Sequence, residues 1–155
     1  MNRLSKTSKP LESHLFNLSK ATKENSYNAI TNNIEITVWP EFVDSQISPL
    51  GSIFIWSYHV RIDNRGTESV KLLNRHWRII DEQGTLQEIE GPGVVGEQPQ
   101  ITASESFQYS SGVHLRYPSG IMSGHYQLEK TNGELFDAKI PAFSLDVPTI
   151  KGVIN

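Results

Sequence analysis

The chain has 155 residues, no cysteine and a formal net charge of −3. This length suits one domain with its own hydrophobic core. The lack of cysteine excludes disulfides, thiolate nucleophiles and cysteine-ligated zinc, and it suits a reducing compartment such as the cytoplasm. No stretch approaches the roughly 18 apolar residues of a membrane span, so we expect a cytoplasmic protein with no membrane partner.

Charge divides the chain unevenly. Residues 1–30 carry five basic and two acidic side chains, 5 − 2 = +3, which leaves −6 for the rest. An acidic domain is a poor binder of phosphate backbones, so nucleic acid is excluded as a partner. The basic segment lacks the apolar core of a secretory signal. We therefore predict a flexible, disordered leader over residues 1–32, a domain over 33–147 and a tail over 148–155.

From residue 33 onward the pattern is that of strands. Ile34, Ile36 and Val38 alternate with polar residues, as in a half-buried strand. Pro40 and Pro49 predict an irregular connection between this strand and the next. The longest predicted strand covers residues 53–62, and its inward face is expected to consist of alternate residues: Phe54, Trp56, Tyr58, Val60 and Ile62.

A hairpin is predicted around Asn132-Gly133. A two-residue turn would place Leu128 opposite Asp137, whereas a three-residue loop places Leu128 opposite Phe136. The apolar pairing favours the second register, and Gly133 supplies the left-handed residue that a three-residue loop needs.

A second three-residue loop is predicted over residues 82–84. Its register pairs Ile80 with Leu86, Arg78 with Glu88, and Trp77 with Ile89. Continued along the two strands, the same register places Glu90 opposite His76 and Gly91 opposite Arg75.

Further strands are predicted over residues 105–111, 122–130 and 135–143. About seven to eight short strands without intervening helices predict an all-β fold, an antiparallel β-sandwich of the immunoglobulin or fibronectin type III kind. Trp56, Trp77 and Tyr126 are expected in its core. Edge strands of sandwiches often pair, so a homodimer is a candidate assembly.

Residues 91–96 fit the spacing GxGxxG, but Pro99 and extended chain follow where a dinucleotide site needs a helix. One hypothesis is an anion-binding nest of backbone amides beside a cationic side chain. The alternative is a glycine-rich crossover loop between two sheets, with no ligand. The candidate anion or nucleotide site consists of Gly91, Pro92, Gly93, Val94, Val95, Gly96, Arg75 and His76.

No catalytic constellation is visible. Ser110-Ser111-Gly112 lacks the strand–turn–helix context of a nucleophile elbow. Histidines occur at positions 59, 76, 114 and 125 without the spacing of a preformed ligand pair, so we predict no metal site. An enzyme is not expected.

Several segments recur together in one known family. They are Leu72-Leu73-Asn74-Arg75-His76-Trp77, the stretch from Gly91 to Pro99, Phe107-Gln108-Tyr109-Ser110-Ser111-Gly112, the stretch from Gly120 to Tyr126, and Ile140-Pro141-Ala142-Phe143. On these motifs the chain resembles the ApaG family, also called CorD, over about residues 33–147. The resemblance implies a fibronectin type III-like sandwich, an interaction role without enzymatic activity, and a link to cobalt resistance and magnesium efflux. It also implies an ability of the glycine loop to hold pyrophosphate or nucleotide.

We therefore predict a non-catalytic binding module with a protein partner whose identity the sequence does not give. The alternative is a sensor of phosphate, pyrophosphate or nucleotide that uses residues 91–96. No firmly bound cofactor is expected; a weakly bound pyrophosphate, nucleotide or divalent cation is the candidate ligand.

Overall fold

The computed structural model describes residues 25–148, and these form nine β-strands and no α-helix. The strands are β1 (Tyr27–Thr31), β2 (Ile34–Ser48), β3 (Gly51–Asn64), β4 (Val70–Asp81), β5 (Leu86–Pro92), β6 (Gln100–Ile101), β7 (Ser106–Leu115), β8 (Ser119–Lys130) and β9 (Leu135–Asp146). Within these residues no helix has the length and apolarity to cross a membrane.

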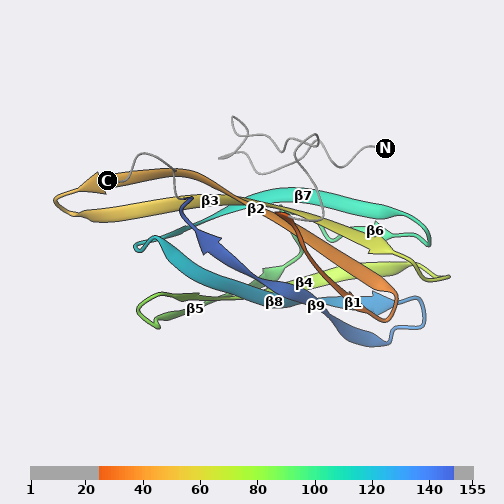
Figure 1. Cartoon of the computed structure of the whole chain (residues 1–155). Helices are drawn as coiled ribbons and strands as arrows, with labels where there is room; N and C mark the ends of the chain where they lie inside the picture. Colours follow the sequence, from red (N-terminus) through yellow and green to blue (C-terminus); the bar gives the residue numbers. More distant parts are fainter. Residues whose placement is uncertain (1–24, 149–155) are drawn as a thin grey trace.

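The strands form two layers (Figure 1). Sheet A has the order β1-β2-β3-β7; sheet B has the order β5-β4-β8-β9, and the short β6 also pairs with β4. Every strand pair is antiparallel. The predicted fibronectin type III-like sandwich is confirmed.

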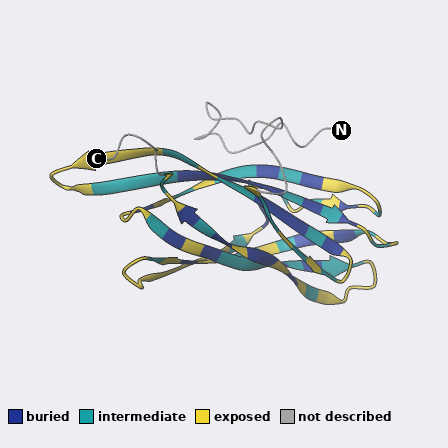
Figure 2. Cartoon of the chain, in the orientation of Figure 1, coloured by how far each residue is buried: buried dark blue, intermediate teal, exposed yellow. Residues whose placement is uncertain are grey.

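Side chains from both sheets meet in one core (Figure 2). On β3 the predicted inward face is confirmed, since Trp56, Tyr58, Val60 and Ile62 are buried and Phe54 is half-buried. Aromatic rings join the layers: Tyr58 of sheet A lies 5.2 Å from Trp77 of sheet B, between ring centroids. Trp56, Trp77 and Tyr126 are core residues as predicted.

Both predicted hairpin registers are confirmed. Leu128 pairs with Phe136, and Gly133 has a φ of 89°. In the other hairpin Ile80 pairs with Leu86, and the register continues to the pairs His76–Glu90 and Arg75–Gly91.

The structured domain starts earlier than the sequence pattern indicated. Strand β1 lies inside residues 1–32, and Tyr27 pairs with Val38 of β2. This strand is hard to detect from sequence because Ile30, its largest aliphatic side chain, points to solvent. The other residues of the predicted leader, 1–24, and residues 149–155 of the predicted tail lie outside the described part of the chain.

The connection expected between Pro40 and Pro49 was wrong. Strand β2 continues through Pro40 as far as Ser48, with a bulge between Phe42 and Asp44. Strand β1 pairs with β2 only as far as Val38, so Pro40 lies where β2 has become an edge strand. Proline is tolerated at such positions because its missing N–H removes no bond between interior strands.

Candidate functional site

The glycine-rich stretch forms a loop along one edge of β4. It leaves β5 and returns as β6, and both of these strands pair with β4. The carbonyl oxygen of Leu73, at the bulge of β4, accepts hydrogen bonds from the Gly93 amide (2.8 Å) and from Gln98 Nε2 (2.9 Å). The expected crossover between sheets was therefore misplaced, because the chain changes sheet only after β6.

The loop uses left-handed backbone conformations, and position 93 requires glycine. Gly93, Val95 and Gly96 have φ angles of 64°, 41° and 82°, in the left-handed region. Val94 and Glu97 exchange two backbone hydrogen bonds of 2.8 and 2.9 Å, which close a tight turn. A side chain on Gly93 would place its Cβ 2.1 Å from the Glu97 carbonyl oxygen. The buried Val94 fixes this turn to the core.

Arg75 holds the loop from the inner side. Its Nη1 donates hydrogen bonds of 3.0 Å to the carbonyl oxygens of Pro92 and Gly93. The guanidinium lies close over Gly91, where an added Cβ would stand 3.0 Å from Nη1. The structure thus brings Arg75 and the glycines together, as the predicted register required.

These contacts use donors that an anion would need. The amides of Gly93, Val94 and Glu97 already donate to carbonyl oxygens of the protein, and Arg75 Nη1 donates to the loop. An anion nest needs convergent amides that are available to the ligand. We call residues 91–98 the braced loop, because hydrogen bonds within the protein hold it in place. A phosphate would have to displace some of these bonds.

The other predicted neighbour, His76, lies on the opposite face of the sheet. Arg75 pairs across β4 and β8 with the fully buried Tyr126, whereas His76 pairs with the partly exposed His125. Adjacent residues of a strand point to opposite faces. The candidate site residues therefore separate into an inner group with Arg75 and an outer position with His76.

Arg75 also lies near a buried group of tyrosines. The hydroxyl oxygens of Tyr109 and Tyr126 are 2.5 Å apart. Burial raises the pKa of Tyr58 to about 12 and raises the pKa values of Tyr109 and Tyr126 well above their usual range, while the positive charge of Arg75 opposes each shift. All three hydroxyls therefore stay protonated at neutral pH. The sequence predicted inward positions for Tyr58 and Tyr126, whereas the buried position of Tyr109 was not predicted.

The outer face of sheet A carries a serine–histidine pair. His59 Nδ1 lies 2.7 Å from Ser110 Oγ, and His59 Nε2 lies 2.7 Å from Gln108 Oε1. A catalytic triad needs a carboxylate in the third position to stabilise the imidazolium. Gln108 carries no charge, and burial lowers the pKa of His59. The arrangement has the chemistry of a neutral hydrogen-bonded network.

The outer face of sheet B carries a pair of histidines, His76 and His125. The rings of His76 and His125 lie side by side with 5.0 Å between centroids. Carboxylates of Glu88, Glu90 and Asp137 surround them. Spacing along the chain gave no sign of this grouping, although the predicted register had already placed Glu90 opposite His76.

The hairpin of β2 and β3 projects beyond the other strands of sheet A (Figure 1). Strand β7 pairs with β3 only from Phe54 onward. Near the tip the side chains of Ile47 and Leu50 are 71% and 95% exposed. Sheet B has a second exposed apolar row, in which Ile80 pairs with Leu86 on one side and with Ile121 on the other.

Comparison with known proteins agrees with this fold. Residues 44–130 match the family model described as the ApaG domain. The chain is 49% identical over 129 residues to Protein ApaG of Methylocella silvestris and equally to that of Agrobacterium fabrum, which covers 83% of this chain and 99% of each relative. A crystal structure described as the ApaA protein from Bordetella pertussis superposes with a TM-score of 0.70 at 37% identity, over 76% of this chain and 95% of that one.

Proposed function

Since the chain belongs to the ApaG family, we propose that it is a non-catalytic binding module whose partner is a protein. The observation that carries this proposal is the projecting hairpin of β2 and β3. It combines an open strand edge with exposed aliphatic side chains. Both features favour recognition of an extended peptide segment.

The open edge belongs to β2. Among the described residues, β1 pairs with β2 only as far as Val38, so residues 42–48 have a single strand neighbour, β3. Edge strands present unpaired backbone donors and acceptors, and natural proteins usually protect them with lysine, proline or a covering element. Beyond the bulge between Phe42 and Asp44, residues 45–48 include no charged residue and no proline. This edge is therefore available for addition of a strand.

The side chains of the hairpin indicate the chemistry of the partner. Ile47 and Leu50 offer apolar contacts at the tip. Residues 40–55 contain two acidic side chains, Glu41 and Asp44, and the guanidinium of Arg116 lies beside Gly51 at the tip. An extended segment with aliphatic side chains complements this surface.

The physiological setting that we propose is divalent-cation homeostasis in the cytoplasm, which the family resemblance suggested. The nucleotide-sensor hypothesis has weaker support, because Arg75 and the amides of Gly93 and Val94 are already used within the protein. It stays a prediction.

Site-specific cross-linking tests the proposal. A photoreactive residue at Gln46, in the full-length chain and its native cells, should capture a protein, and peptide mapping should place the link in an extended segment of that protein. The double variant Ile47→Glu, Leu50→Glu should lose this product, because it replaces the apolar contacts at the tip with two carboxylates.

Ile30→Glu is the matched control, since Ile30 is an exposed isoleucine (61%) on β1, outside the hairpin. It should leave the product unchanged. An equal yield from the double variant and the control would refute the proposed surface. A link from Gln46 to a second copy of this chain would identify the hairpin as a dimer interface instead.

A further inference from the structure

Sheet B brings five potential metal ligands together on its outer face. They come from four neighbouring strands and form the histidine–carboxylate cluster: His76 (β4), Glu88 and Glu90 (β5), His125 (β8) and Asp137 (β9). This cluster lies on the sheet that does not contain the β2–β3 hairpin, so it is independent of the proposed protein-binding surface.

Three members are close enough to share one ion. One ligand atom each from His76, Glu88 and Glu90 lies within 4.8 Å of the other two. Nε2 of His76 is 3.5 Å from Glu88 Oε1, and Nδ1 is 3.6 Å from Glu90 Oε2. Ligands around a metal with bonds of about 2.1 Å lie roughly 3 to 3.5 Å apart. The two carboxylates face different nitrogens of one imidazole, so an ion bound through Nε2 requires the Glu90 side chain to rotate towards that nitrogen.

The state of His76 is a second observation in favour of a ligand. Its Nε2 is buried from solvent and has no hydrogen-bond partner in the structure of residues 25–148. A buried polar atom without a partner needs an explanation, and a bound ion is one of the recognised explanations. A metal bound between the imidazole and the carboxylates would satisfy this nitrogen.

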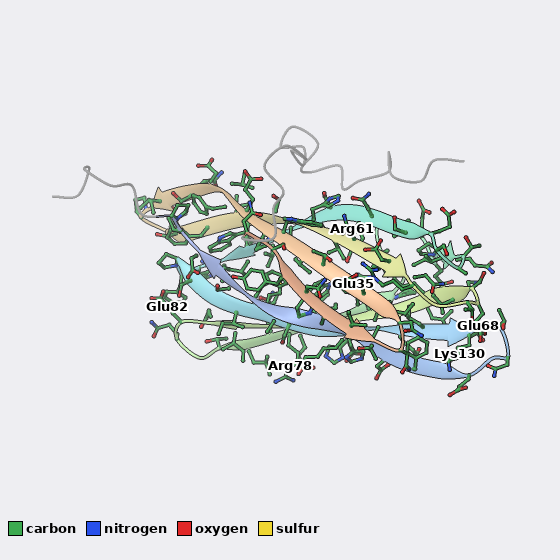
Figure 3. All side chains as sticks on the ribbon, turned by 45° about the vertical axis from the view of Figure 1, so that its right-hand side comes forward. Glu35, Arg61, Glu68, Arg78, Glu82 and Lys130 are labelled. Carbon is green, nitrogen blue, oxygen red and sulfur yellow. The ribbon has the colours of Figure 1, made fainter. Side chains whose placement is uncertain are left out.

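The surroundings favour a cation. Three carboxylates face two imidazoles, and Arg78 is the neighbouring cation: its Nη1 donates a hydrogen bond of 2.8 Å to Glu88 Oε2, which leaves Oε1 towards His76. Arg78 itself projects from the outer side of sheet B, at the bottom of Figure 3. Hydrogen bonds that fix a ligating carboxylate are typical of metal sites. Strand positions also hold ligands more rigidly than loops do.

We propose that His76, Glu88 and Glu90 bind one divalent transition-metal ion, with His125 beside them as a further imidazole ligand. An imidazole together with carboxylates suits Zn²⁺, Co²⁺ or Ni²⁺, whereas Mg²⁺ and Ca²⁺ prefer sites made of oxygen atoms alone. The ligand class is therefore a borderline first-row cation.

The test is calorimetric titration of the full-length, chelator-treated protein with Co²⁺ and with Zn²⁺, together with the visible absorption of the Co²⁺ form. One ion should bind per chain, and an equal concentration of Mg²⁺ should not displace it. His76→Gln should weaken the affinity by about tenfold or more. His114→Gln is the matched control, because His114 is an exposed strand histidine in sheet A, and it should bind as the wild type does.

Circular dichroism of each variant checks that the sandwich has folded. If His76→Gln does not fold, Glu90→Gln decides, because the Glu90 side chain is 67% exposed and its replacement leaves the core intact. Failure of the wild type to bind either ion at millimolar concentration would overturn the proposal. The proposal would also be overturned if His76→Gln and Glu90→Gln bound the metal ion with the same affinity as His114→Gln.

Discussion

The hydroxyl of Tyr109 and the hydroxyl of Tyr126 share a hydrogen bond of 2.5 Å across the interior of the sandwich. Tyr109 belongs to β7 of sheet A and Tyr126 to β8 of sheet B. Both side chains are buried. This polar contact therefore ties the two layers together where most contacts are apolar, and it fixes how the layers face each other.

Removing one of the two hydroxyls should be more harmful than removing both. Tyr109→Phe leaves the Tyr126 hydroxyl buried without this partner, which we expect to lower the free energy of unfolding by about 1–3 kcal/mol. The double variant Tyr109→Phe, Tyr126→Phe removes both polar groups and should recover part of that loss. Urea denaturation of the wild type, both single variants and the double variant measures the coupling. Additive effects of the two substitutions would contradict it.

Glycines in the braced loop should differ in their tolerance of a side chain. Gly93→Ala should destabilise the domain strongly, because its Cβ would stand 2.1 Å from a backbone oxygen of Glu97. Gly96→Ala meets no atom within 4 Å and should cost only the roughly 1–2 kcal/mol of a left-handed alanine. Thermal unfolding of the two variants compares them. Equal melting temperatures would mean that the loop does not hold the turn described for Val94 and Glu97.

Arg75 should matter for stability whether or not the loop has a ligand. Arg75→Ala removes two charge-assisted hydrogen bonds to the loop, and we expect a loss of about 1.5–3 kcal/mol in unfolding free energy. Calorimetric titration of the wild type with pyrophosphate, ATP and diadenosine tetraphosphate should show no saturable binding below millimolar concentrations, since the amides of Gly93, Val94 and Glu97 and Arg75 Nη1 already donate within the protein. If the wild type binds one of these ligands below millimolar concentration and Arg75→Ala does not, the nucleotide-sensor hypothesis is restored.

The buried His59 should make stability depend on pH. Burial lowers its pKa in the folded state below the ordinary value of 6.5. As the pH falls through 6.5 the unfolded chain takes up a proton before the folded one does, so this group's contribution is complete above 6.5 and declines below it. Urea denaturation of the wild type and His59→Gln between pH values of about 7.5 and 5.5 should give a steeper loss for the wild type. Parallel pH profiles would exclude this role.

The hairpins could be predicted from sequence because two independent constraints agree there. Gly133 allows the left-handed turn, and the pairing of Leu128 with Phe136 sets the register. The same reasoning placed Gly91 opposite Arg75, and the structure confirmed it. Alternation along the same strand assigns adjacent residues to opposite faces, so grouping the side chains of Arg75 and His76 into one candidate site was wrong.

Features that depend on nonlocal strand order could not be predicted in this way. Pro40 indicated a break, but its tolerance depends on β1 ending at Val38, and β1 itself shows little apolar alternation. The meeting of His76 with His125 requires the pairing of β4 with β8, whose register shifts at the Leu73 bulge. Hydrophobic periodicity within one strand carries no information about either fact.

Mutations on the two faces of β4 should have separate effects. Arg75 supports the loop inside, while His76 lies among carboxylates outside. Single substitutions can therefore alter one face and leave the other intact. Deletion or insertion of one residue in this strand would exchange the faces, placing the imidazole in the interior and the guanidinium in solvent. Relatives that retain both features must therefore preserve the length of this strand as well as its side chains.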